Sequence, residues 1–593
     1  MSVNEADLKE VGKRAQENAN LIWNAANSLF GAFKPHEYGL VILPMCVIKR
    51  FHDCLLPTHE AVIEANKKFA SAGPLKAGFL RKASGYQFYN TSTFTFEKLK
   101  SLPDEIEENF DDFLHGFSDN VMEILTRMNF FAQVDRMKEA KVLYQVICDF
   151  STENLDMSPV RISTVDMGYI FENLIQRFSE SYDEDAGTHF TSRDIIYLMC
   201  DLLVTNSNAL NDADGFHCTV YDMTMGTSQM LTCMEERLKQ IDERADVTTF
   251  GQEINPFTMG IAAADTLIHG GDPNNMKFGN TLSDDRFVGY EFDFCISNPP
   301  FGIDWKREAD VIEKEHKLGE AGRFAPGLPV KSDGQMLFLL NGISKLKQSG
   351  KMAIIQNGSS LFTGDAGSGQ SEIRKYIIEN DWLDAIVQLP NDSFYNTGIP
   401  TYVWLIDKTK PFRSPGKIQL IDASSCSEAR RKPIGSKRVD ITDECRDVII
   451  EVYKNYKSGV FKTTLPSGEM VSCESKVIDS IEFGYTKITI ETPKLDNKGN
   501  RIMKKGKPVA DVSKRDTENI PLSEDVQDYF ETEILPSNPG AWIEKSKVGY
   551  EIPFTRIFYK YQKLEDMEII QSRISELEEK ISASFAKLFP KEG

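Results

Sequence analysis

The stretch Phe292-Asp293-Phe294-Cys295-Ile296-Ser297-Asn298-Pro299-Pro300-Phe301 carries most of the prediction of fold and chemistry. Its first six residues form an apolar run, which indicates a buried strand. The two prolines fix φ and remove two backbone donors, so free carbonyl acceptors lie beside the Asn298 side-chain oxygen and the ring of Phe301. This arrangement suits an exocyclic amino group on a flat ring. For the tetrapeptide alone, an ordinary Pro-rich turn is an equally good interpretation.

The composition is that of a globular protein with an acidic surface. The chain has 593 residues, 41% of them apolar and 26% charged, which is enough for roughly three to four domains. Its formal net charge is −21. This is the wrong sign for a protein that binds DNA by itself, because non-specific affinity for DNA comes from neutralising its phosphates. On charge alone, simple solubility is the better explanation. If the substrate is nucleic acid, we expect another subunit to supply much of the affinity for it.

Cysteine usage and hydropathy place the chain in a reducing, aqueous compartment. The ten cysteines are scattered without a CxxC pair, mostly in apolar stretches, which is typical of reduced core residues rather than of a disulfide framework or a metal site. No run of about 18 apolar residues occurs, and the first residues lack a secretory segment. We therefore expect a cytoplasmic protein without membrane contact.

Sequence patterns divide the chain into four segments. Residues 1–155 carry apolar residues at helical spacing and predict a helical domain, in which 76–95 is expected to be an ordered loop. Residues 156–412 alternate strand-like and helix-like segments, as in a parallel α/β sheet. Residues 413–548 are polar and lysine-rich and predict an irregular extension. Residues 549–593 end in a clear helical pattern.

Acidic and glycine-containing motifs follow the predicted strands of the α/β region in a definite order: Asp222-Met223-Thr224-Met225-Gly226-Thr227-Ser228, then Gly251-Gln252-Glu253-Ile254-Asn255, then Gly279-Asn280-Thr281-Leu282. An acid at a strand end can hold both hydroxyls of a ribose, although a solvated strand-end carboxylate explains Glu253 alone equally well. If each motif follows a strand end, all of them meet in one crevice at the carboxyl edge of the sheet.

These motifs, followed by Asn298-Pro299-Pro300-Phe301, resemble those of DNA amino-methyltransferases that use S-adenosylmethionine. With its helical N-terminal region, the chain is similar to the modification (methylase) subunit of type I restriction–modification systems. The supporting stretches are Gly187–Arg193, Phe301–Lys306, Ser332–Phe338, Phe394–Pro400 and Gly549–Phe554. The resemblance implies a Rossmann-like α/β methyltransferase domain over 156–412, with an N-terminal all-helical domain and a C-terminal helical extension.

The resemblance also implies the residues of the site. The catalytic residues would be Asn298, Pro299, Pro300 and Phe301, and the cofactor S-adenosylmethionine would contact Thr191, Asp222, Gly226, Thr227, Ser228, Glu253 and Asn280. Asn298 Oδ1 and the Pro299 carbonyl would accept the two N–H bonds of an adenine N6 amino group. The adenine would be flipped out of the duplex, with Phe301 stacking on it.

The chain departs from the family in its cofactor motif. That motif usually reads Asp-Pro-x-x-Gly-Thr/Ser-Gly-Gly, whereas this chain has Met223 in place of Pro, and Ser228 and Gln229 in place of the glycines. A side chain at 228 or 229 would narrow the space near the methionine part of the cofactor and would disfavour a positive φ.

The last segment predicts a partner-binding helix. Leu564, Met567, Ile570, Ile574, Leu577, Ile581 and Leu588 recur mostly at three- and four-residue steps, which gives a narrow apolar seam suited to a coiled-coil partner or to packing on its own domain. The partners implied by the resemblance are double-stranded DNA with a flipped adenine, a DNA specificity subunit bound through this helix, a restriction (translocase and nuclease) subunit, and a second copy of the chain.

Two alternatives to DNA adenine methylation stay open. One is a protein or rRNA amino-methyltransferase, which can share the Asn-Pro-Pro-aromatic turn. The other is a non-catalytic scaffold with the same fold, in which the Ser228-Gln229 change has abolished cofactor binding.

Overall fold

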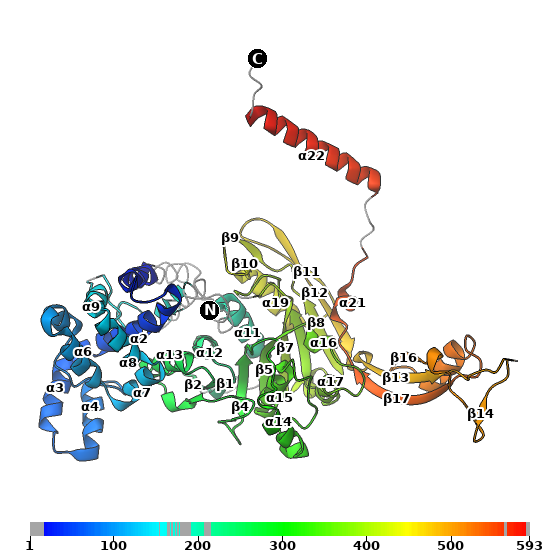
Figure 1. The fold of residues 1–593 in the computed structure, drawn as a ribbon, viewed down its shortest axis with the longest axis horizontal. Coiled ribbons are helices and arrows are strands. Elements are labelled where there is room, and N and C mark those ends of the chain that lie inside the picture. Colours follow the sequence, from blue (N-terminus) through cyan, green and yellow to red (C-terminus); the bar gives the residue numbers. More distant parts are fainter. Residues whose placement is uncertain are drawn as a thin grey trace. The chain divides into compact units, whose positions relative to one another are not determined.

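The computed structural model describes residues 17–588 except 153, 163–165, 168, 169, 172, 175, 176, 178–190, 207–214, 396, 498 and 562–565. Leu564 and residues 187–190 of the predicted motifs therefore lie outside the described part. The chain forms two compact units, Met1–Ile552 and Pro553–Gly593 (Figure 1). None of the helices in the described ranges combines the length and apolar character needed to cross a membrane.

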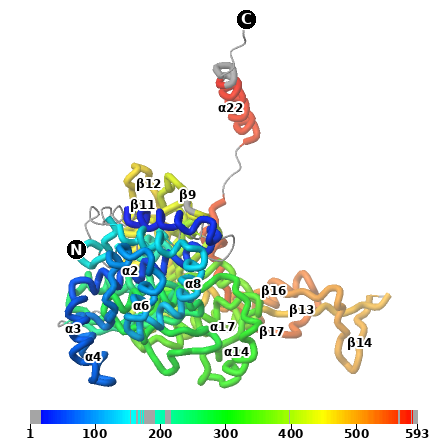
Figure 2. The backbone as a smooth tube through the Cα atoms, turned by 60° about the vertical axis from the view of Figure 1, so that its left-hand side comes forward, coloured from blue at the N-terminus to red at the C-terminus, as the bar shows by residue number. Residues whose placement is uncertain are grey.

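The first part of the large unit is helical, as predicted. Its helices are α2 (Gly39–Leu55), α3 (His59–Lys68), α4 (Lys76–Ser84), α5 (Phe96–Lys100), α6 (Ile106–His115), α7 (Asp119–Arg127), α8 (Phe130–Glu139) and α9 (Leu143–Phe150). Helix α2 is buried along almost its whole length, so it forms the centre of this helical part. The tube in Figure 2 shows α6 and α8 close to α2.

One local prediction in this region is wrong. The predicted loop 76–95 begins with α4, which ends at Gly85 in the left-handed conformation (φ 76°). Farther along, a short break at Gly116 separates α6 from α7. A Cβ at Gly116 would lie 2.2 Å from Asn90 Oδ1, so a larger residue at this position would require the neighbouring segment to move.

A ten-stranded sheet forms the centre of the large unit, in the order β11-β12-β8-β6-β7-β5-β4-β1-β2-β3. Its strands are β1 (His217–Asp222), β2 (Asp246–Glu253), β3 (Met276–Phe278), β4 (Phe292–Ser297), β5 (Leu346–Asn357), β6 (Leu383–Gln388), β7 (Thr401–Asp407), β8 (Lys417–Asp422), β11 (Gly459–Thr464) and β12 (Met470–Asp479). Every residue of β4 and β7 is buried, as expected of strands covered on both faces. The α/β fold predicted from the sequence is confirmed.

The sheet differs from the prediction in direction and extent. Strand β7 runs antiparallel to both of its neighbours, β5 and β6, whereas the sequence predicts a parallel sheet. The predicted methyltransferase domain ends at 412, but the sheet continues through β8, β12 and β11. In the first half of β12, buried residues alternate with half-exposed ones, so this strand lacks the continuous apolar run that reveals the central ones.

Helices between the strands pack in groups. They are α11 (Arg193–Val204), α12 (Gln229–Ile241), α13 (Pro256–Ile268), α14 (Ala309–His316), α15 (Gln335–Ser344), α16 (Ser359–Phe362), α17 (Gly369–Glu379), α18 (Lys410–Arg413) and α19 (Asp443–Asn455). Helix α11 contacts α12 and α19, α15 contacts α17, and α13 contacts β2, β3 and the N-terminal helices α2 and α7. Helix α13 thus joins the helical part to the edge of the sheet.

The ten cysteines are all free.

A second sheet follows in the region predicted to be irregular. Strands β13 (Gly484–Glu491), β16 (Asp516–Pro521) and β17 (Trp542–Tyr550) pair antiparallel in the order β16-β13-β17. They carry a small core of their own: Ile488, Ile490, Ile520, Phe530, Ile534 and Ala541. We call residues 484–550 the arm, because both views show it projecting from the rest of the large unit (Figures 1 and 2).

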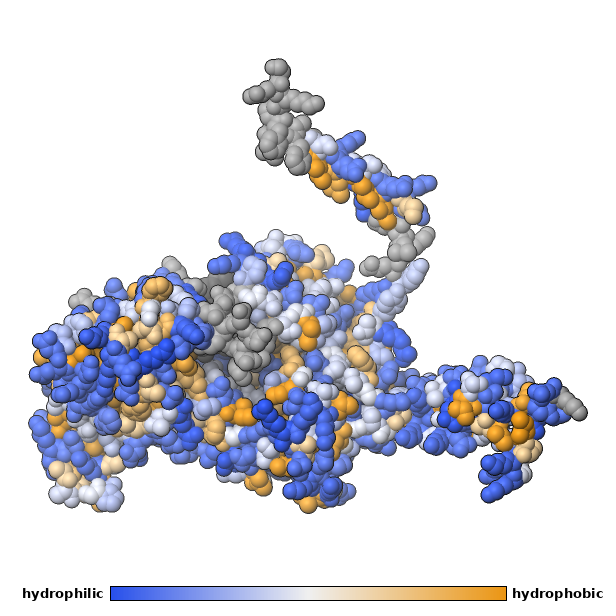
Figure 3. Space-filling model, viewed as in Figure 1, coloured by the Kyte–Doolittle hydropathy of each residue, from blue (hydrophilic) through white to orange (hydrophobic). Residues whose placement is uncertain are grey.

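The small unit, Pro553–Gly593, contains α21 (Phe554–Phe558) and α22 (Met567–Leu588). The predicted C-terminal helix is therefore present. Figure 3 shows the apolar residues of α22 gathered along one side of the helix.

Candidate active site

Three neighbouring parallel strands end together at one edge of the sheet. In the order β4-β1-β2, β1 ends at Asp222, β2 ends at Glu253, and Asn298 follows β4 directly. All three residues line one cavity of about 440 Å³. The predicted crevice at the carboxyl edge of the sheet is therefore present, and its size is ordinary for a small-molecule site.

Most residues of the predicted site lie in the wall of this cavity, namely Thr191, Asp222, Gly226, Thr227, Glu253, Asn280, Asn298 and Pro300. Ser228, Pro299 and Phe301 do not line it. Ser228 and Pro299 are buried, and the Phe301 ring meets the Phe394 ring edge to face with centroids 6.3 Å apart.

Asp222 is held in place by short hydrogen bonds to one oxygen. Ser297 Oγ donates to Asp222 Oδ1 at 2.6 Å, and the Thr224 backbone N–H donates to the same oxygen at 3.0 Å. Burial raises the pKa of Asp222 to about 7, although both hydrogen bonds oppose this shift. Such a shift at a buried acid in a cavity is typical of functional sites.

Glu253 fastens the loop after β1 to the end of β2. The Gly226 backbone N–H donates to Glu253 Oε2 at 2.9 Å, and the Asn255 backbone N–H donates to Oε1 at 2.7 Å. The Met225 N–H donates to the Gln252 carbonyl at 3.1 Å. Gly226 has a φ of +55°, where a side chain would be strained. The loop therefore brings backbone and carboxylate to the cavity wall together.

A side chain at position 228 was predicted to narrow the space for the cofactor and to disfavour a positive φ, but Ser228 meets neither expectation. It does adopt a positive φ, +65°, as a glycine would. Its Oγ is buried, finds no hydrogen-bond partner in the described chain, and does not narrow the cavity. Gln229, the other residue that replaces a glycine, does line the cavity. Replacement of the two glycines of the family motif therefore strains the backbone at Ser228 and changes the cavity wall at Gln229.

Asn298 presents a buried acceptor beside the cavity. Its Nδ2 donates to Thr191 Oγ1 at 2.8 Å, which fixes the orientation of the amide. Its Oδ1 is buried, and no described residue donates to it. A buried oxygen without a partner costs free energy, so this atom is available to a donor from outside the described residues.

Several residues of the site were missed by the sequence analysis. Ser297 could have been noticed as a hydroxyl at the end of an otherwise apolar strand. Glu308 gave no signal; its Oε1 accepts from Asn280 Nδ2 at 3.1 Å. The cavity is also lined by Ile254, Asp304, Trp305, Arg307 and Phe338. All of these except Arg307 lie in the motifs or supporting stretches quoted above, but none was assigned to the site.

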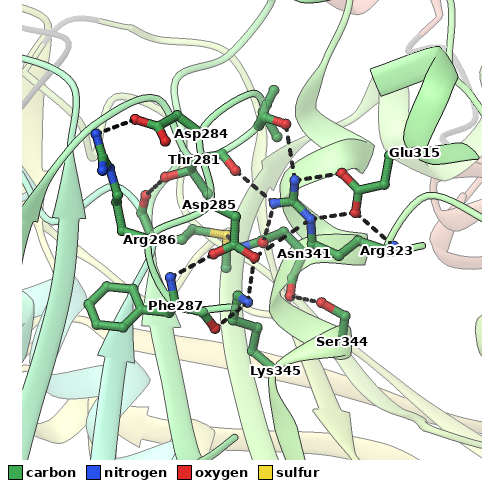
Figure 4. A network of polar contacts seen from close by, with 12 residues as sticks. Thr281, Asp284, Asp285, Arg286, Phe287, Glu315, Arg323, Asn341, Ser344 and Lys345 are labelled. Carbon is green, nitrogen blue, oxygen red and sulfur yellow. Dashed lines mark hydrogen bonds and ion pairs between the residues drawn. The ribbon is translucent and has the colours of Figure 1, made fainter. Parts of the chain in front are cut away.

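Behind the cavity, Arg323 holds the loop that carries Thr281 (Figure 4). Its Nη1 donates to the Thr281 carbonyl at 2.7 Å, and its Nη2 donates to the Leu282 carbonyl at 3.1 Å and to Glu315 Oε2 at 2.7 Å. Lys345 Nζ contacts Asp285 Oδ2 of the same loop at 2.7 Å. The two side chains are 11% and 5% exposed, so largely buried contacts hold this loop at the far wall of the cavity.

The chain is similar to known proteins over most of its length. The family described as N-6 DNA Methylase matches residues 163–482, and the family described as HsdM N-terminal domain matches residues 18–150. The MjaIX methylase subunit of a type I restriction enzyme from Methanocaldococcus jannaschii is 23% identical over 75% of this chain and 78% of its own length. The HindI methylase subunit from Haemophilus influenzae is 25% identical over 55% of this chain and 69% of its own.

The fold has a counterpart among solved structures. The methyltransferase subunit of a type I restriction–modification system from Streptococcus thermophilus superposes with a TM-score of 0.60 at 22% identity, covering 79% of this chain and 97% of that one.

Proposed function

Because this chain belongs to the N-6 DNA methylase family, we propose that it transfers a methyl group from S-adenosylmethionine to the N6 amino group of adenine in DNA, as the modification subunit of a type I restriction–modification complex. One observation carries this proposal: the buried Oδ1 of Asn298 accepts no hydrogen bond from any described residue and lies beside a cavity lined by Asp222 and Glu253. Similarity to methylase subunits of type I enzymes supports it.

The cavity fits S-adenosylmethionine in size and in chemistry. Glu253 offers carboxylate oxygens to the ribose hydroxyls, the loop through Gly226 and Thr227 brings its backbone close, and Ile254 is 57% exposed, an apolar surface for the adenine ring. When bound, the cofactor supplies an electrophilic methyl group. Asp222, with its raised pKa, can donate a hydrogen bond as a neutral acid near pH 7 or accept one when ionised.

Asn298 would act by orienting the target amine. The N6 lone pair of adenine is delocalised into the ring, so the amine is a poor nucleophile. Asn298 Oδ1 and the Pro299 carbonyl accept its two N–H bonds, which favours a tetrahedral nitrogen and directs its lone pair. A neutral amide is sufficient, since the alkylated nitrogen is acidic and releases its proton readily. Phe301 stacks on the extruded base and offsets part of the unstacking cost.

The test is Asn298→Ala in the full chain, purified with its specificity subunit. Methyl incorporation into DNA should fall by at least about 100-fold, while S-adenosylmethionine binding measured by calorimetry stays within a factor of about 2, because Asn298 holds the substrate. Asn380→Ala, an exposed amide at the end of α17, is the matched control. Retained activity would refute the role of Asn298. No heat of cofactor binding in the wild-type chain would favour the scaffold alternative instead.

Helix α22 would bind the specificity subunit. Met567, Ile570, Ile574, Leu577 and Ile581 alternate at three- and four-residue steps and are between 44% and 75% exposed. This heptad pattern is the sequence requirement of a coiled-coil seam. Contacts with the restriction subunit and with a second copy of the chain stay predictions of the family resemblance.

Substitution on the seam tests this assignment. Ile574→Asp places a charge in the seam and should abolish co-elution with the specificity subunit on a sizing column, whereas Ser575→Asp, the next residue on the same helix, should not. Cofactor binding should be equal in both variants. Equal assembly of the two variants would show that the seam is not the contact.

A further inference from the structure

The outer end of the arm is strongly basic in an acidic chain. Residues 494–515 hold eight Lys and Arg against two Asp, a net charge of +6, whereas the whole chain carries −21. We call this segment the basic hairpin. It lies outside both matched families, which cover residues 18–150 and 163–482.

The tip of the basic hairpin keeps its lysines at a cost to local stability. Strands β14 (Met503–Lys504) and β15 (Lys507–Pro508) pair so that Lys504 lies directly opposite Lys507, and like charges in that position are destabilising. Lys505 and Gly506 have φ values of +51° and +77°, as in a type I′ turn, where Asn is preferred over Lys at the first position. Folding alone does not explain three lysines here.

These cations are available to a partner. Lys494, Arg501, Lys504, Lys505, Lys507 and Lys514 are all exposed, and none of them has an ion-pair partner within the described residues. Arg515 is different, because its Nη2 lies 2.5 Å from Glu491 Oε1.

The arm presents the basic hairpin on a firm support. Its three strands enclose their own core, and its base is fastened to α17 by Arg374, whose Nε donates to the Tyr550 carbonyl at 2.7 Å. Lys487 pairs with Asp365 at 2.8 Å. The tip lysines are therefore presented on a scaffold that is folded and attached.

We infer that the basic hairpin binds the phosphate backbone of duplex DNA, independently of base sequence. This inference rests on the proposed function, which makes DNA the substrate. A backbone is a regular row of single negative charges and needs no shaped pocket, and a two-stranded ribbon is narrow enough to follow a groove. Protein interfaces, by contrast, are depleted in lysine, so clustered free lysines favour a polyanion over a protein partner.

The test compares the wild-type chain with Lys504→Gln/Lys505→Asn/Lys507→Gln, both purified with the specificity subunit. Affinity for a fluorescent duplex that lacks the target site is measured by anisotropy at several salt concentrations. Each phosphate contact contributes about 0.9 to the slope of log K against log salt, so three lost contacts should reduce the slope by about 2.7 and the affinity at 0.15 M salt on the order of 100-fold. An unchanged slope would overturn the inference.

Two further variants separate DNA binding from damage to the fold. Lys454→Gln/Lys457→Gln/Lys462→Gln removes three exposed lysines of α19, β11 and the loop between them and should leave the slope unchanged. Lys505→Asn alone suits the turn better than lysine, so it should melt at or above the wild-type temperature while the slope falls by about 0.9. An equal fall in slope in the control triple variant would mean that the basic hairpin has no special role.

Failure of this inference can be distinguished from failure of the proposed function. We call Lys504→Gln/Lys505→Asn/Lys507→Gln the tip variant. At low salt it should bind S-adenosylmethionine and methylate a target duplex as the wild-type complex does. If the wild-type complex methylates adenine but the tip variant keeps its salt slope, only the inference fails. If the tip variant instead loses the specificity subunit on a sizing column with unchanged DNA affinity, the basic hairpin is a protein-docking element and the inference is wrong.

Discussion

Ser228→Gly should stabilise the chain, because Ser228 carries two local costs. Its φ of +65° lies in the left-handed region, which costs an L-residue roughly 1–2 kcal/mol. Its Oγ is buried and without a partner in the described residues, which costs about 1 kcal/mol or more. Glycine removes both costs but loses about 0.5–1 kcal/mol through its greater freedom in the unfolded chain. The net gain should be about 1.5–2 kcal/mol.

Ser228→Ala separates the two contributions. Alanine removes the hydroxyl but keeps a Cβ at the same positive φ, so it should gain only about 1 kcal/mol. Urea unfolding of the full chain, followed by circular dichroism, gives the free energy of unfolding of all three proteins. The expected order is glycine above alanine above wild type, with equal dependence on urea.

Cofactor binding provides a second measurement on the same proteins. Because the Ser228 side chain does not line the cavity, calorimetry should give S-adenosylmethionine affinities within about twofold of wild type for both variants. A glycine variant no more stable than the alanine variant would refute the claim that the turn is strained. A tenfold change in affinity would show that the side chain reaches the cofactor.

Three other perturbations have definite expected outcomes. Asp222→Asn removes a carboxyl whose pKa is raised to about 7 in the folded chain. Between about pH 4 and pH 7 this carboxyl ionises in the unfolded chain but stays protonated in the folded one. The free energy of unfolding of the wild type should therefore fall by up to about 4 kcal/mol relative to the variant over this range and then level off. Urea unfolding without cofactor from pH 4 to 8 measures this gap, and a pH-independent gap would contradict it. Arg323→Met breaks a buried cluster and should cost about 3–5 kcal/mol. Arg286 pairs with Asp284 at 2.7 Å, with both side chains about half exposed, so Arg286→Met should cost less than about 1 kcal/mol; urea midpoints measure both. Thr191→Val removes the acceptor that orients Asn298 and should lower kcat about five- to tenfold in a methyl-transfer assay at saturating cofactor. An unchanged kcat would mean that Asn298 orients itself.

The central strands could be predicted from the sequence because they are continuous apolar runs. The predicted strand 292–297 matches β4 at both ends. The direction of β7 could not be predicted, since a strand buried on both faces has the same pattern whether it runs parallel or antiparallel. The arm was missed because its strands are mostly polar and cover only a small core.

The candidate site was predictable where it depends on strand ends. Asp222, Glu253 and Asn298 each stand at the end of a predicted strand, so the topology of the sheet brings them together. The hydrogen bond between Asn298 and Thr191 joins residues 107 positions apart, and Arg323 reaches the loop at Thr281 from outside any motif. Such contacts depend on how loops fold over the sheet edge, and residue order alone does not contain that information.

The place of β7 in the sheet has a consequence for how the protein is made. The ribosome releases β5 and β6 before β7, yet β7 must enter between them. If β5 and β6 pair with each other in the nascent chain, β7 cannot insert between them and the chain is kinetically trapped in a misfolded state. Such misfolding is a risk because non-local strand pairing is slow and leaves strand edges exposed. We therefore expect the yield of active protein to be sensitive to pauses in translation between residues 389 and 407 and to chaperones that keep nascent strands apart.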